Sequence, residues 1–189
     1  MTQQGKNAID LVLAESLIEL SAKKPIDKIT IKEITDKAGV IRPTFYNHFQ
    51  DKYELIEWII KTELLEPIKP LLNAGMIFEA IVLMLNNITA NSVFYKKALK
   101  LEGAVTFNQI AMKCVYEMFM NIISEKSTGK KSKSRWLTPE VISTYYAQSL
   151  CFITEGWIAQ GMDDIEPKEM AEAYMYLITR SMDDILSEL

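Results

Sequence analysis

Apolar residues recur at intervals of three and four along much of this chain, and that spacing restricts the fold more than any other feature of the sequence. Between Asn7 and Ala22 the apolar side chains fall on one face of a helix; these are Ile9, Val12, Leu13, Leu17 and Leu20. Strict apolar/polar alternation, the pattern of a half-buried strand, is hard to find, and only seven glycines and six prolines occur among 189 residues. The sequence therefore predicts an all-α fold of about nine helices.

A helix-turn-helix is predicted in the first quarter of the chain. Thr30 and Glu33 have the Thr-x-x-Glu spacing of a capping box, in which side chains satisfy amides left free at a helix N-terminus. Gly39 ends this helix, because glycine most readily adopts the left-handed conformation found at helix C-termini. A second short helix is expected at 42–48. In a helix-turn-helix this second helix enters the major groove of DNA.

The remainder is predicted to continue as helices. Asp51 is expected to cap a helix that runs to Pro67. Periodicity then predicts five more helical segments, at 68–74 together with 76–90, and at 92–101, 105–126, 139–161 and 167–187. We expect two domains: residues 1–52 form the three-helix DNA-binding domain, and residues 53–189 form a helical bundle for ligand binding and dimerisation.

Composition and charge exclude several classes of protein. The net charge is −4, yet residues 1–52 carry eight Lys/Arg and seven Asp/Glu, so only this quarter is electrostatically compatible with DNA. No apolar run reaches the ~20 residues of a membrane span, and nothing at the N-terminus is typical of a secretion signal, so we expect a cytoplasmic protein. Cys114 and Cys151 stand apart in apolar segments, as reduced core thiols do.

An enzyme is not expected. The sequence has no glycine-rich phosphate loop and no nucleophile-base pattern, and no cofactor is implied. His48 is the only histidine, and no Cys, Asp or Ser pattern around it supports catalysis or a metal site. We therefore predict no metal site, although Asp163, Asp164 and Glu166 could bind a cation loosely.

The predicted helix-turn-helix carries a family signature. The run Ile-Thr-Ile-Lys-Glu-Ile-Thr-Asp-Lys-Ala-Gly-Val-Ile-Arg-Pro-Thr-Phe-Tyr-Asn-His-Phe-Gln-Asp-Lys-Tyr-Glu-Leu, residues 29–55, closely resembles the N-terminal signature of tetracycline-repressor (TetR) type regulators. The match covers residues 9–58 and includes the Ala-Gly-Val turn, the Thr-Phe-Tyr-x-His-Phe core and the following Asp-Lys. The resemblance implies a DNA-binding transcription regulator.

The same resemblance assigns roles to individual residues. Thr30 matches a phosphate contact at the start of the second helix, although it could simply cap that helix. The positions on the recognition segment implied to reach base edges are Arg42, Thr44 and Asn47, of which Arg42 is the strongest candidate. Tyr46, His48 and Lys52 match positions that contact phosphates or groove walls. Pro43 also lies in this contact segment, where the family more often has glycine, so the approach to the bases is expected to differ.

The C-terminal part resembles the family only in outline. In this architecture the middle helices commonly enclose an effector pocket, and the candidates for its walls are Met84, Phe94, Phe107, Met112, Tyr116, Phe119 and Tyr146. The alternative, a simply packed core at 68–125, stays open. The last two predicted helices are implied to form a four-helix dimer interface through Tyr145, Phe152, Ile153, Trp157, Tyr174, Leu177 and Ile178.

These inferences combine into one functional expectation. The chain is expected to be a homodimeric repressor that binds double-stranded operator DNA and is released by an unknown small-molecule effector. The segment 152–161 with Pro167 and Ala171 resembles regulators related to the dihydroxyacetone-kinase activator. That similarity suggests an alternative, a transcriptional activator or coactivator controlled by a protein partner.

Overall fold

The protein is built from helices alone in the part that the structure describes. The computed structural model describes residues 3–103, 105–126 and 134–188, and within them it contains eleven α-helices and no strand, which confirms the all-α prediction. The helices are α1 (Gln3–Ser21), α2 (Ile31–Ala38), α3 (Arg42–Tyr46), α4 (Lys52–Ile59), α5 (Lys69–Asn73), α6 (Ile77–Ala90), α7 (Ser92–Ala98), α8 (Phe107–Lys126), α9 (Pro139–Ala159), α10 (Pro167–Thr179) and α11 (Met182–Glu188).

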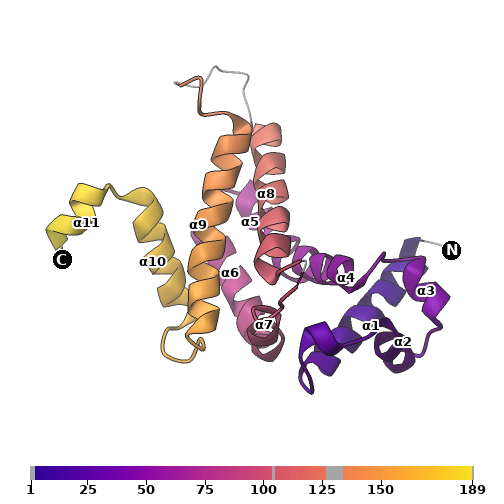
Figure 1. Ribbon diagram of the computed structural model, residues 1–189. Helices are drawn as coiled ribbons and strands as arrows, with labels where there is room; N and C mark the ends of the chain where they lie inside the picture. The colour runs from indigo at the N-terminus through magenta and orange to yellow at the C-terminus, as the bar shows by residue number, and fades with distance from the viewer. Residues whose placement is uncertain (1–2, 104, 127–133, 189) are drawn as a thin grey trace.

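Helices α1, α2 and α3 pack together at one end of the molecule (Figure 1). Leu13 and Leu17 of α1, Ile34 of α2 and Phe45 of α3 are completely buried between them. Gly39 has φ +69°, the left-handed conformation that lets the chain turn directly from α2 towards α3. The N-terminal helices therefore form the compact helix-turn-helix that the sequence predicts.

Helix α4 connects this unit to the bundle and changes its hydrogen-bonding pattern on the way. Asp51 caps it by accepting hydrogen bonds from the amides of Tyr53 and Glu54, as expected. After Ile59 the chain continues without a break into a π-helical segment, η2 (Ile60–Leu65). No glycine or proline occurs within η2, so nothing in its residues indicated that the helix would widen there.

The C-terminal bundle is centred on the long antiparallel pair α8 and α9, which stand upright in Figure 1. Helix α10 packs against α6 and α9, and α7 packs against α9 on one side and α1 on the other. Helix α7 therefore contacts both the bundle and the helix-turn-helix unit. Helices α10 and α11 lie at the opposite side of the molecule from α1–α3 (Figure 1).

The last predicted helix, 167–187, is wrong as a single element. The chain leaves the helical conformation at Arg180 (φ −109°, ψ 151°), and Ser181 starts α11 by exchanging hydrogen bonds with Asp184. This Ser-x-x-Asp pair is a local start signal of the same kind as Thr30 and Glu33. Among the described residues no single helix is long and apolar enough to cross a membrane; α6 and α7 reach that length only together, across an 88° bend.

Candidate functional site

Helix α3 presents a small polar surface to solvent. Arg42, Pro43, Tyr46 and Asn47 are exposed and Thr44 is partly exposed. Phe45 and Phe49 point the other way and are buried, 0% and 4% exposed. The five-residue helix therefore separates a core-forming face from a face that is free for a partner.

Arg42 and Tyr46 form a pair on the exposed face. The Arg42 Nη2 and Nε donate to the Tyr46 hydroxyl at 2.9 and 3.3 Å, and the guanidinium lies 5.4 Å from the centre of the Tyr46 ring. Because a guanidinium has five N–H donors, this contact leaves donors for a further partner such as a guanine edge. Ile41, which precedes the helix, is 69% exposed. The sequence analysis did not single it out, and it adds an apolar contact beside Arg42.

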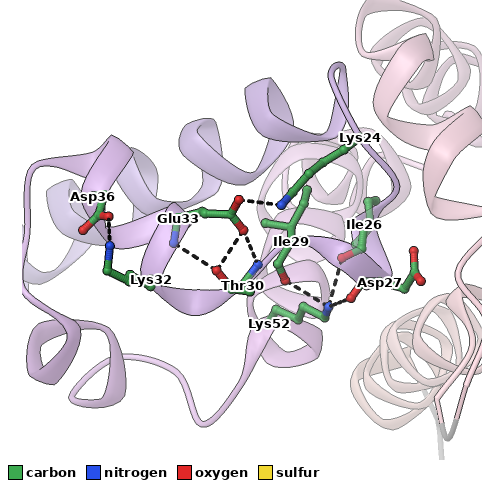
Figure 2. A network of polar contacts seen from close by, with 9 residues as sticks. All are labelled: Lys24, Ile26, Asp27, Ile29, Thr30, Lys32, Glu33, Asp36 and Lys52. Atoms are coloured by element: carbon green, nitrogen blue, oxygen red, sulfur yellow. Dashed lines mark hydrogen bonds and ion pairs between the residues drawn. The ribbon is translucent and has the colours of Figure 1, made fainter.

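The start of α2 is occupied by a closed hydrogen-bonding network (Figure 2). The Thr30 hydroxyl donates to Glu33 at 2.8 Å and accepts from the Glu33 amide, while the Thr30 amide donates to the Glu33 carboxylate at 2.9 Å. Lys24 donates to the same carboxylate at 2.5 Å. These contacts, that with Lys24 foremost, lower the pKa of Glu33 to about 2. The capping role of Thr30 is thus present in the structure, and a phosphate would meet the remaining amides of the first turn.

Lys52 has a different position from the one expected of a phosphate contact. Its ammonium group donates to three backbone carbonyls, those of Ile26, Asp27 and Ile29, at 2.9, 2.7 and 3.1 Å (Figure 2). An ammonium has three donors, so all are used. Burial lowers the pKa of Lys52. The side chain ties the start of α4 to the turn between α1 and α2.

His48 is likewise held inside the domain. Its Nδ1 lies 2.6 Å from the Asp10 carboxylate of α1, and the two side chains are only 2% and 9% exposed. A carboxylate can only accept, so Nδ1 carries the proton. This contact fixes the chain that follows α3 against α1. Neither His48 nor Lys52 is therefore part of the exposed surface, and their partners lie 23 to 38 residues away in sequence.

The C-terminal bundle contains two adjoining cavities. The outer cavity, about 380 Å³, lies between α6, α8, α9 and α10, and the inner cavity, about 40 Å³, lies between η2, α7, α8 and α9. Of the seven predicted pocket residues, four line one or both cavities: Met84, Phe107, Phe119 and Tyr146. The other three, Phe94, Met112 and Tyr116, line neither.

Two polar residues that the sequence analysis missed line the inner cavity. They are Tyr95 of α7 and Thr154 of α9. Their hydroxyl oxygens are buried and have no hydrogen-bonding partner among the described residues. Thr154 and Glu155 are the polar residues in the otherwise apolar stretch 150–158, and they were the only feature of the sequence that indicated a polar site on α9.

The residues predicted for a dimer interface fall into three groups. Tyr145, Phe152 and Leu177 are exposed, by 62%, 78% and 48% respectively. Trp157 and Tyr174 are each 3% exposed, and the Trp157 indole donates to a backbone carbonyl of the same chain. The remaining two, Ile153 and Ile178, are partly buried. Only the first group is fully available to a second subunit.

Within residues 3–103, 105–126 and 134–188, no group of three or more His, Cys, Asp or Glu side chains is arranged to hold a metal ion.

Models of known protein families match both the N-terminal and the C-terminal part of the chain. A family model for bacterial regulatory proteins of the tetR family matches residues 15–59, and a model for a transcriptional regulator C-terminal region matches residues 76–180. The chain is 26% identical over 152 residues to the HTH-type dhaKLM operon transcriptional activator DhaS of Lactococcus lactis subsp. lactis (strain IL1403), covering 79% of each chain.

Solved structures share the fold. A structure of the dihydroxyacetone kinase operon activator DhaS superposes with a TM-score of 0.60 at 20% identity and covers 95% of each chain. NalD, the secondary repressor of the MexAB-OprM multidrug efflux pump in Pseudomonas aeruginosa, superposes with a TM-score of 0.59 at 12% identity, covering 92% of this chain and 96% of NalD. The same architecture is thus found in an activator and in a repressor.

Proposed function

Since the chain belongs to the TetR family of transcriptional regulators and is not an enzyme, we propose that it is a homodimeric repressor whose α3 surface reads operator DNA and whose bundle binds a small-molecule effector. The observation that carries this proposal is the exposed polar face of α3, and the chain that follows it is held by internal contacts of His48 and Lys52. Such a protein acts where the DNA is, in the cytoplasm. Residues 1–52 form its DNA-binding domain and residues 53–189 its effector and dimerisation domain.

The DNA contacts follow from the exposed groups. Arg42 and Asn47 provide the donors and acceptors that pair with guanine and adenine edges, with Thr44 beside them. Tyr46 orients Arg42 and faces the groove wall, and Pro43 brings a flat apolar surface close to the bases. The first-turn amides next to Thr30 bind a backbone phosphate. His48 and Lys52 act as positioning residues, because their polar groups are engaged within the domain.

Dimerisation uses the outer faces of α9 and α10. Tyr145, Phe152 and Leu177 leave an apolar stripe on these helices, and Gly156 and Ala159 continue it with small exposed residues. Small residues allow close packing of helices from two subunits related by a two-fold axis. Two such subunits present two α3 helices to successive major grooves.

The effector site is the pair of cavities in the bundle. A ligand held there touches η2, which continues α4, and α7, which packs against α1. A ligand that favours one arrangement of these elements changes the spacing between the two α3 helices of the dimer, and release from DNA follows.

A second function is favoured by a separate observation. The relative with 26% identity is a transcriptional activator, and α11 exposes the apolar side chains of Met182 and Leu186 by 70% and 60%. An activator controlled by a protein partner would use such a surface. It would respond to that partner and to no small molecule.

Selection of bound sequences from a random duplex pool tests the proposed function. The purified full chain is used at a stated salt concentration, because phosphate contacts make affinity depend strongly on salt. The expected result is enrichment of a two-fold-symmetric site by the wild-type protein and by Arg135→Ala, which removes a charge from an exposed position before α9. No enrichment from folded dimeric protein would contradict the proposal.

A further inference from the structure

The two cavities of the bundle adjoin each other. Met84 of α6 and Leu150 of α9 line both of them, so these two side chains form the partition between the outer and the inner cavity. Methionine is flexible and has a high tolerance for repacking. Joining the two cavities into one site requires Met84 to change its rotamer.

The size and walls of the outer cavity define what fits there. A cavity of ~150 Å³ lined by aliphatic and aromatic residues already binds benzene, and the outer cavity is about 380 Å³. Its lining is mainly aliphatic and aromatic, with Ile81 and Phe119 among the residues, and it contains no Lys, Arg, Asp or Glu. An elongated apolar body of ten or so carbon atoms matches these dimensions.

The inner cavity differs because two of the residues that line it carry unpaired hydroxyls. Its accessible surface is apolar, so a polar group reaches these oxygens only when the two side chains turn towards it. Buried polar groups in folded proteins are almost always hydrogen-bonded, so each exception needs a reason. Tyr95 and Thr154 come from different helices, line the same cavity, and both have buried hydroxyl oxygens without a partner among the described residues. The cavity exceeds the space that one hydrogen-bonding group needs. These two hydroxyls are suited to a small polar group that arrives with a ligand.

The charges around the inner cavity restrict that polar group. Glu155 lines the cavity, and both of its carboxylate oxygens accept hydrogen bonds from Asn108 at 2.8 Å. Glu63 of η2 lies close enough to Tyr95 to raise the pKa of its hydroxyl further than burial alone. An anionic group would be repelled by both carboxylates. A cation would lose its hydration, because the accessible surface of the inner cavity is apolar.

We propose that the effector is an uncharged amphiphile, an apolar body of about ten carbon atoms with one hydroxyl-type head group, whose body fills the outer cavity and whose head enters the inner cavity lined by Tyr95 and Thr154. This inference rests on the proposed function for its regulatory meaning. The head group then contacts α7, the helix that packs against α1 of the DNA-binding domain.

The test uses three probes with the same chain and different heads: 1-decanol, decanoate and decylamine. Thermal unfolding of the full chain is measured with each probe at equal concentration, without DNA. At about tenfold excess over its Kd, 1-decanol is expected to raise Tm by about 3 °C or more, and the two charged probes by much less. In wild-type protein 1-decanol also weakens the affinity for the selected duplex.

Isosteric variants identify the head-group site. Tyr95→Phe and Thr154→Val each remove a hydroxyl without leaving a hole, and the double variant is expected to bind 1-decanol about tenfold more weakly. Ser143→Ala is the matched control, because Ser143 of α9 also has a buried unpaired hydroxyl but lines neither cavity. It is expected to retain the wild-type response to 1-decanol.

Four results would overturn the inference: equal stabilisation by decanoate or decylamine, undiminished 1-decanol binding by the double variant, no binding of any probe, or binding that leaves the affinity for the duplex unchanged. The probe series uses only wild-type protein, so it tests the proposed effector class even if a variant does not fold. If a duplex is selected and no probe binds, the effector class is wrong and the proposed DNA binding stands. If 1-decanol binds and no duplex is selected, the proposed function is wrong.

Discussion

The two ends of the molecule differ in how their polar side chains are paired. In the helix-turn-helix, the side chains of Lys52, His48 and Glu33 each have internal partners at 2.5–3.1 Å. In the bundle, three buried hydroxyls have none among the described residues: Tyr95, Ser143 and Thr154. In the helix-turn-helix, these hydrogen bonds hold the surface of α3 in one position. The bundle leaves space and hydrogen-bonding capacity unused.

This difference fits two different tasks. A surface that reads base edges must keep its side chains in a fixed geometry relative to the groove. A site that responds to a ligand gains from groups whose hydrogen bonds form only when the ligand is present, because the ligand then has a differential affinity for one state.

The bundle is expected to accommodate a ligand without exposing its interior to solvent. Burial raises the pKa of the Cys114 and Cys151 thiols to about 12, against 9 for a free thiol. At pH 8 the native thiolate fraction is therefore about a thousandfold lower than in the unfolded chain, and labelling by a thiol reagent should slow by at least that factor. Cys151 lines the inner cavity, so its rate reports on that cavity directly. Fast labelling of native protein would mean that the bundle opens to solvent.

Removing one polar contact from the helix-turn-helix is expected to be costly. Lys52→Met removes a donor from three backbone carbonyls, of which that of Ile26 keeps the Ile29 amide. The change should lower the free energy of unfolding by about 2–3 kcal/mol and Tm by roughly 5–10 °C. Thermal and denaturant unfolding measure this. Lys32→Met is the control, because its ion pair with Asp36 is exposed on both sides and contributes little. Equal effects of the two variants would remove the basis for calling Lys52 a positioning residue.

Removing a hydroxyl from the bundle is expected to cost nothing. Tyr95→Phe and Thr154→Val eliminate buried groups that have no partner, so the free energy of unfolding without ligand should stay constant or rise by up to about 1 kcal/mol. The same unfolding experiments test this. A loss of stability as large as that of Lys52→Met would show that these hydroxyls are paired, and the contrast between the regions would disappear.

The smallest effect concerns the exposed carboxylate of Glu33. Its pKa is lowered from 4.5 to about 2, first by Lys24, so its contribution to stability is complete above pH 4.5 and is lost as the pH falls towards 2. Glu33→Gln should therefore lower Tm by ~1–2 °C at pH 7, and the difference should vanish near pH 2. If the difference in Tm between wild-type protein and Glu33→Gln persists unchanged at low pH, the ionised carboxylate of Glu33 does not cause the stabilisation.

The sequence predicted those features that depend on near neighbours. The capping residues Thr30 and Asp51 and the turn glycine Gly39 act within a few residues, and all three were found where expected. The π-helical segment η2 had no such signal. The break at Arg180 had one, the pair Ser181 and Asp184, which was overlooked.

The roles of individual polar residues were harder to predict because they depend on tertiary contacts. His48 and Lys52 match family positions that face DNA, yet their partners here come from α1 and from the turn after it. The cavity residues Tyr95 and Thr154 have ordinary sequence surroundings, and only packing brings them to the same space. Trp157 and Tyr174 continue an apolar face that their own subunit covers.

The claim that α3 reads bases is tested most directly by the ratio of Kd values for a random duplex and the selected duplex, measured by fluorescence anisotropy for wild-type protein, Arg42→Ala and Arg135→Ala. Loss of one bidentate arginine contact to a base should reduce that ratio about tenfold or more in Arg42→Ala. Arg135→Ala should keep the wild-type ratio. If Arg42→Ala weakens binding to both duplexes equally, or to neither, Arg42 does not read the sequence and the proposed recognition surface is wrong.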